Sequence, residues 1–155
     1  MFFGPRGGNY ALQASVNGTN HKIVKLKKGV AYKACVRAWR TVDGVKTYIG
    51  EASPDVFAIA GGRNNKYTNA KKITVKKKKL TLNVGGSKKI KAKVKKASNS
   101  RRFLPKVAKI RYFSSDRSVA TVNAKGKVTA VGAGTCTVYA VAQNGLRVGV
   151  TITVK

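Results

Sequence analysis

The sequence predicts an all-β protein, and three features support that fold class. Helical periodicity is almost absent along the 155 residues. Short stretches in which apolar and polar residues alternate recur throughout, and Gly, Asn, Asp and Ser separate them. Apolar residues make up 43% of the chain, which is enough to form compact cores. We therefore expect antiparallel strands with one buried face, arranged in one ordinary domain or two small ones.

Residues 1–62 carry the pattern of the later half of a β-sandwich. The segment Leu26-Lys-Lys-Gly-Val-Ala-Tyr32 leads into a strand that Val36-Arg-Ala38 continues. Asp43-Gly44 predicts a hairpin, and Ser53-Pro54 opens a last strand. This part resembles the later half of a fibronectin type III domain. The resemblance implies a tyrosine corner, in which the Tyr32 hydroxyl bonds to backbone upstream of it.

The first strands of such a domain, with its usual core tryptophan, have no counterpart in residues 1–62. Without them one apolar face would be exposed, and we do not expect a half-sandwich of this kind to be stable alone. We expect residues 1–62 to be a partial module of a longer multidomain chain. The polar residues 63–70 are expected to form a linker, and residues 71–155 a second module.

The second module contains four motifs in order: 80–87, 114–122, 126–130, and Gly134-Thr135 before a strand. Gly85 and Gly86 suit a turn with positive φ, and Ser114-Ser115-Asp116 can turn the backbone through side-chain hydrogen bonds. Residues 71–155 resemble a group 2 bacterial immunoglobulin-like (BIG2) domain. The resemblance implies an antiparallel Ig-like β-sandwich. The segment 97–107 is longer than the usual connection and is expected to form a protruding basic loop.

Three stretches of the second module alternate most clearly. Every even position from 146 to 154 is apolar, and similar alternation runs through 90–94 and 136–140. Cys136 belongs to an inward set and is expected in the core, whereas Cys35 lies between the inward-facing Ala34 and Val36 and is expected to point outward. The two cysteines lack the spacing of a zinc site, and we expect neither a disulfide nor a metal.

Positive charge dominates the surface that the sequence predicts. The net charge is +29, and residues 71–155 carry 22 basic groups against one acid, Asp116. Lysines outnumber arginines by 24 to nine, which indicates a diffuse positive field more than shaped recognition of phosphates. Lysines on edge strands also discourage edge-to-edge pairing. The candidates for polyanion binding are Lys76, Lys77, Lys78, Lys79, Lys88, Lys89, Lys91, Lys93, Lys95, Arg101 and Arg102.

The chain contains few residues that could act as a catalytic acid or base. The histidine and carboxylates of the whole chain are His21, Asp43, Glu51, Asp55 and Asp116, and no pair has catalytic spacing. We expect no enzymatic activity and no cofactor. Calcium is disfavoured because it requires several carboxylates. Trp39 and Tyr48 could form an aromatic platform for sugars or bases, but cross-strand packing is the commoner role of such residues.

The resemblance to a BIG2 domain implies a noncatalytic structural or adhesion module, extracellular or on a bacterial cell surface. Its expected partners are anionic cell-wall polymers or polysaccharides, or a host or matrix ligand, together with adjacent domains of its own chain. No apolar run is long enough to span a membrane, and the first ten residues lack signal-peptide features. Two alternatives stay open: a carbohydrate-binding accessory module of an extracellular enzyme, and nonspecific nucleic-acid binding driven by charge.

Overall fold

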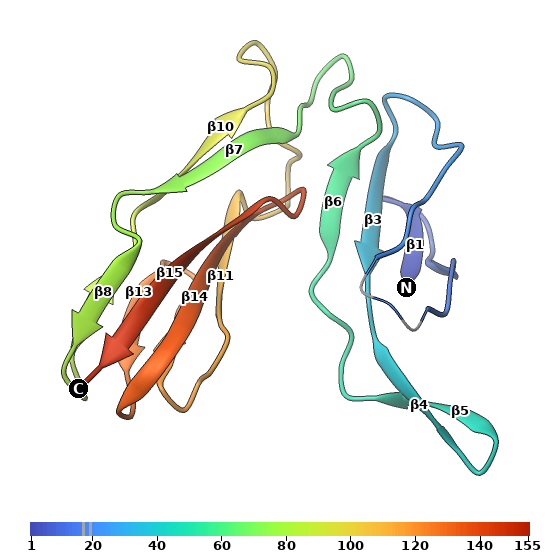
Figure 1. Cartoon of the computed structure of the whole chain (residues 1–155). Helices are drawn as coiled ribbons and strands as arrows, with labels where there is room; N and C mark the ends of the chain where they lie inside the picture. The colour runs from blue at the N-terminus through green and yellow to red at the C-terminus, as the bar shows by residue number, and fades with distance from the viewer. Residues whose placement is uncertain (17, 19) are drawn as a thin grey trace. The chain divides into compact units, whose positions relative to one another are not determined.

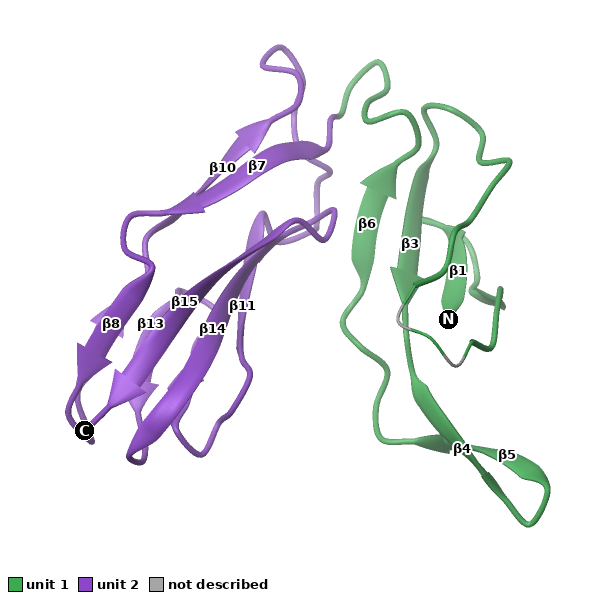
Figure 2. Ribbon diagram, in the orientation of Figure 1, with its two compact units in different colours: residues 1–67 green, residues 68–155 purple. Residues whose placement is uncertain are grey.

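The chain is all-β, as the sequence predicts. A computed structural model describes residues 1–16, 18 and 20–155, and every regular element in them is a β-strand (Figure 1). The strands belong to two compact units, Met1–Tyr67 and Thr68–Lys155 (Figure 2).

The first unit consists of one antiparallel sheet and a hairpin. The sheet has the order β2 (Ala11–Leu12), β1 (Phe2–Pro5), β3 (Ala31–Cys35), β6 (Val56–Ile59). The hairpin pairs β4 (Ala38–Val42) with β5 (Val45–Ile49). Asp43 and Gly44 join its strands with φ of 50° and 77°. Two successive positive φ angles are the mark of a tight hairpin turn that favours Asp-Gly, so the turn expected at this dipeptide is confirmed.

The first unit buries few apolar side chains. Among its described residues, the buried ones are Cys35 and Ile59. The expectation that Cys35 points to solvent is wrong, because Tyr10 lies against this face of β3, where its hydroxyl interacts with Cys35. Val36, expected to point inward, lies beyond the end of β3 and is exposed. A core this small leaves the unit dependent on its hydrogen bonds and ring contacts.

The bond that the tyrosine-corner pattern predicts is present: the Lys27 N–H donates to Tyr32 Oη at 3.1 Å. We expect Tyr32→Phe to lower the free energy of unfolding of the first unit by about 0.5 to 1.5 kcal/mol, because it removes this bond and little else. Urea unfolding followed by the fluorescence of Trp39, the one tryptophan, measures the change. Tyr67→Phe makes the same chemical change elsewhere in the unit and is the control. Equal stability of the two variants would show that the corner bond contributes nothing.

The second unit contains two facing sheets and a two-stranded ribbon. The larger sheet has the order β11 (Ile110–Ser114), β14 (Gly134–Ala142), β15 (Arg147–Val154), β8 (Lys79–Leu82). The smaller sheet has the order β12 (Ala120–Val122), β13 (Lys127–Ala130), β9 (Ser87–Lys89). The ribbon pairs β10 (Ala92–Lys96) with β7 (Ala70–Val75). All these pairs are antiparallel except β8 with β15.

The main core of the second unit lies between its two sheets. Val128 and Ala130 of the smaller sheet pack in one cluster with Val138, Val150 and Ile152 of the larger sheet. Cys136 is buried in the same cluster, so its predicted core position is confirmed. A second cluster lies under the ribbon and joins Ile73 to Ala140 and Ala142. These clusters make the unit a β-sandwich whose inner side chains are those that alternate in the sequence.

Two turns of this unit require glycine. Gly85 adopts φ of +78°, as expected, whereas Gly86 does not have positive φ. Gly126 also has φ of +78°, and a Cβ there would lie 2.8 Å from the Tyr112 ring and 3.0 Å from the Ile90 carbonyl oxygen. The carbonyl of Gly126 accepts a hydrogen bond from the Ile90 N–H at 2.8 Å. Glycine therefore allows the 123–127 turn to lie against the chain as it leaves β9.

The chain changes sheets twice along one side of the sandwich. Alternation predicts one strand through residues 90–94, but Ile90 and Lys91 fall between β9, in the smaller sheet, and β10, in the ribbon. The residues 76–78 likewise connect β7, in the ribbon, to β8, in the larger sheet. Alternation continues through the second connection, where Ile90 is buried and Lys91 is exposed, so the sequence does not reveal the change of partner strand there. The first connection does not alternate, since Lys76, Lys77 and Lys78 are all exposed. Both lysine-rich segments lie at these crossings.

Candidate anion-binding surface

The two crossings bring lysines from separate segments together. A hollow of about 170 Å³ is lined by Lys76 and Lys77 from the first connection, Lys88 and Lys89 from β9, and Lys91 from the second connection. Its apolar lining is Val75, Leu80 and Ile90. We call these five lysines the crossover patch. All five are exposed. Ile90 is buried and Val75 and Leu80 are half-buried, so the exposed lysines form the rim of the hollow.

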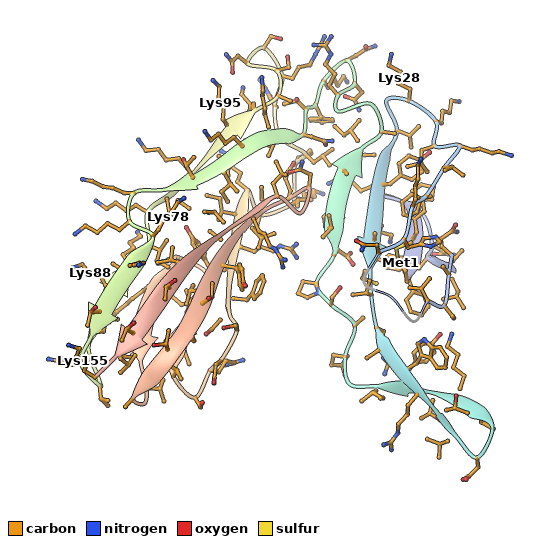
Figure 3. The ribbon with its side chains drawn as sticks, viewed as in Figure 1. Met1, Lys28, Lys78, Lys88, Lys95 and Lys155 are labelled. Carbon is orange, nitrogen blue, oxygen red and sulfur yellow. The ribbon has the colours of Figure 1, made fainter. Side chains whose placement is uncertain are left out.

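Lys78 and Lys79, also predicted, are exposed beside the crossover patch. The Lys78 carbonyl accepts the Thr151 N–H at 2.8 Å, so its backbone is fixed while its side chain is free to extend. Figure 3 shows Lys78, Lys88 and Lys95 along one margin of the second unit.

A larger groove lies on the same unit, between the ribbon and the segment that follows β10. Its volume is about 910 Å³. Its basic lining residues are Lys72, Lys93, Lys95, Lys96, Arg102, Lys106 and Lys109. Its apolar lining residues are Val94, Phe103, Leu104, Pro105 and Val107. We call this feature the basic groove. The basic groove and the crossover patch share no lining residue.

The outer wall of the basic groove is the loop 97–109. The sequence predicts a protruding loop for residues 97–107, but its middle folds back onto the sandwich. Leu104 is buried, and the side chain of Gln143, 1% exposed, binds it twice. The Leu104 N–H donates to Gln143 Oε1 at 3.1 Å, and Gln143 Nε2 donates to the Leu104 carbonyl at 3.3 Å. The side-chain amide of Gln143 thus satisfies both backbone polar groups of Leu104, and this attaches the loop to the end of β14.

The start of this loop is fixed by Lys96 and by the chain before β7. Lys96 Nζ donates to the carbonyls of Asn99 and Arg101, both at 2.6 Å, so this lysine supports the loop. The Thr68 N–H donates to the Arg102 carbonyl at 2.9 Å, and Thr68 Oγ1 accepts the Ser98 N–H at 3.1 Å. Arg101, predicted as a surface cation, is half-buried and does not line the basic groove.

Three of the predicted cations, Lys93, Lys95 and Arg102, line the basic groove. Sequence reasoning missed Lys72, Lys106 and Lys109, which reach it from β7 and the loop. A signal was present: Leu104 is a large apolar residue inside a basic, Pro-containing loop. Gln143 is a polar residue directly after a buried apolar strand. Each is unusual in its place, and together they indicate that the loop packs against the end of that strand.

Cations of like charge face each other across the ribbon. Lys95 lies directly opposite Lys72, and Lys93 lies opposite Thr74. Opposed like charges on one face of a sheet destabilise it, and the basic groove lining includes no acid to compensate. Asp116, the acid of this unit, serves the 114–118 turn, where its carboxylate accepts the Ser118 hydroxyl at 2.6 Å. That bond lowers the pKa of Asp116.

The aromatic pair Trp39 and Tyr48 is directly cross-strand on β4 and β5. Both rings are half-buried, and a basic side chain lies over each of them. Lys46 Nζ lies 4.9 Å from the Trp39 ring centroid and 5.4 Å from that of Tyr48, while the Arg37 guanidinium lies 5.1 Å from the Tyr48 centroid. Lys46 therefore makes cation–π contacts with both rings of the pair.

Asp55 of the first unit has a structural partner. The Tyr10 hydroxyl donates a hydrogen bond to Asp55, and burial together with this bond raises the pKa of Tyr10. Within residues 1–16, 18 and 20–155, no three His, Cys, Asp or Glu side chains come close enough to hold a metal ion. The same residues contain no helix of the length and apolarity needed to cross a membrane.

Comparison with known proteins gives one family and two structural likenesses. The family described as bacterial Ig-like domain (group 2) matches residues 69–154. A mutant of intimin from EHEC O157:H7 is 21% identical with a TM-score of 0.42, over 54% of this chain and 46% of that one. Domains 4 and 5 of the S-layer protein SbsC are 16% identical with a TM-score of 0.47, over 67% of this chain and 62% of that one. The chain thus spans about half the intimin chain. No curated protein matches.

Proposed function

The chain belongs to the family of bacterial Ig-like domains (group 2), and from that premise we propose that it is a noncatalytic structural or adhesion module of a bacterial cell-surface or secreted protein. Its second unit is a compact β-sandwich, a fold that commonly serves as a spacer or a ligand-presenting module. Asp43 and Asp116 lie in turns and Asp55 accepts a hydrogen bond from Tyr10, which supports a role without catalysis.

The first unit is proposed to be a partial fibronectin type III-like module over residues 1–62, joined by residues 63–70 to the Ig-like module over 71–155. The hydrogen bond between Lys27 and Tyr32 supports this assignment, since it has the geometry of a tyrosine corner. The antiparallel order β2-β1-β3-β6 is compatible with one sheet of such a sandwich.

We propose further that the basic surface of the second unit binds anionic cell-wall polymers or polysaccharides. The observation that carries this proposal is charge, since residues 71–155 contain 22 basic groups and one acid, Asp116. The crossover patch is exposed, and so are these residues of the basic groove: Lys72, Lys93, Lys95, Arg102, Lys106 and Lys109. Such a field attracts any polyanion by releasing its counterions. Nucleic acid would be bound through the same field, without reading of bases.

A salt series tests this function. The purified chain is titrated with teichoic acid, heparin, duplex DNA and a neutral glycan, first at low salt. We expect binding to the three polyanions and not to the neutral glycan, with an affinity that falls steeply as salt rises. Absence of polyanion binding at low salt, or equal affinity for the neutral glycan, would contradict the proposal.

A further inference from the structure

We infer that the basic groove is a binding site for one chain of an anionic polysaccharide, and this inference rests on the function proposed above. Acidic groups of the glycan would bind the cations of the two walls, and the apolar faces of its sugar rings would lie on the floor. The site is distinct from the crossover patch. The positive charge of the second unit would attract any polyanion to that patch.

The two walls differ in origin and converge on one space. Lys72, Lys93 and Lys95 project from one face of the β7–β10 ribbon, because Lys95 and Lys93 alternate on β10 and Lys72 is opposite Lys95. Arg102, Lys106 and Lys109 come from the loop 97–109. A volume of about 910 Å³ is that of a ligand site, too small for a nucleic-acid duplex and sufficient for a few sugar units.

The arrangement is fixed before any ligand binds. Gln143 attaches the loop at Leu104, Lys96 spans its first turn, and Thr68 holds Arg102 by a backbone hydrogen bond. A ligand therefore meets cations whose backbone is already ordered, which reduces the entropy lost on binding. The hollow lined by the crossover patch is much smaller, about 170 Å³.

The charges of the ribbon wall are unfavourable without a ligand. Lys72 and Lys95 face each other directly, with Lys93 two residues along the same face, and no acid lines the groove. An anion between the opposed lysines would turn their repulsion into attraction. An anion between the two walls also lies near more cations than it would on a flat surface.

The floor distinguishes a glycan from a nucleic acid. Sites for single-stranded nucleic acid stack successive bases on several aromatic rings. The basic groove is lined by one aromatic residue, Phe103, which is half-buried beside Pro105 and Val107. Small aliphatic surfaces of this kind fit the C–H faces of sugar rings. They provide no ladder for bases, so a glycan is the ligand that the lining favours.

Two triple variants with the same change of charge test the site. One is Lys72→Gln/Lys93→Gln/Lys95→Gln in the basic groove. The other, the control, is Lys125→Gln/Lys127→Gln/Lys155→Gln, at three positions that line neither the basic groove nor the crossover patch. All six lysines are exposed, so both variants should fold, which circular dichroism verifies. Calorimetry in about 0.15 M salt measures binding of a heparin-derived hexasaccharide, an oligogalacturonate, a short polyol phosphate and a single-stranded DNA of matched charge.

We expect the basic groove variant to bind its preferred oligosaccharide about tenfold more weakly, and the control variant to stay within about twofold of the native chain. The sulfated, carboxylated and phosphorylated ligands reveal which acidic group is preferred. Equal losses in the two variants, a loss in the control alone, or tighter binding of the DNA would overturn the inference while leaving the general function intact. If the native chain binds no polyanion even at low salt, both proposals fail.

Discussion

Replacing Ile152 by alanine is expected to lower the free energy of unfolding of the second unit by about 2 to 5 kcal/mol. Ile152 is fully buried on β15, opposite Cys136 on β14 and Leu80 on β8, inside the main core cluster. The change removes three carbon atoms and leaves a cavity among neighbours that two hydrogen-bonded strands hold in place. Because β15 is bonded on both sides, the surrounding backbone cannot move to fill the space.

The control is Ile49→Ala, the same chemical change at an exposed position on β5. Scanning calorimetry of the full chain measures both variants, and Trp39 fluorescence identifies the transition of the first unit. The Ile49 variant is expected to change the unfolding free energy by less than about 0.5 kcal/mol. An Ile152 variant as stable as the Ile49 variant would mean that the space between the sheets is not closely packed.

The strands could be predicted where one face is buried throughout. The even positions from 148 to 154 alternate because β15 lies in the middle of a sheet over one core, and Val150, Ile152 and Val154 are buried as expected. Leu146, the first residue of the predicted series, is exposed and precedes the strand. A periodicity of two identifies the buried face but not the strand that pairs beside it. For that reason the sheet change at 90–91 was not predicted.

The candidate site could be predicted in part, for a similar reason. Charge counts identify lysines as exposed cations, and Lys93 and Lys95 do face solvent on the ribbon. Their partners Lys106 and Lys109 reach the same groove only because the loop is attached at Leu104, through a contact with Gln143 that spans 39 residues. Long-range contacts of this kind leave no periodic trace. The cations of a shaped site and those of a diffuse field look the same in the sequence.

Gln143 is the position at which stability and the basic groove are joined, and Gln143→Leu is expected to affect both. Leucine keeps most of the volume but leaves the buried N–H and carbonyl of Leu104 without their partners, which costs about 2 to 4 kcal/mol of unfolding free energy. The loop would then open to let water reach these groups, and the wall carrying Arg102, Lys106 and Lys109 would lose its fixed position. Oligosaccharide affinity should fall although no cation is removed.

Gln13→Leu, the same change at an exposed position of the first unit, is the control and should leave both the unfolding free energy and the affinity unchanged. Denaturation and calorimetric titration measure them, and hydrogen exchange at the Leu104 amide reports the opening directly. A Gln143 variant with lower stability but native affinity would show that the loop does not form a wall of the binding site, and native stability would show that Leu104 is satisfied by other groups.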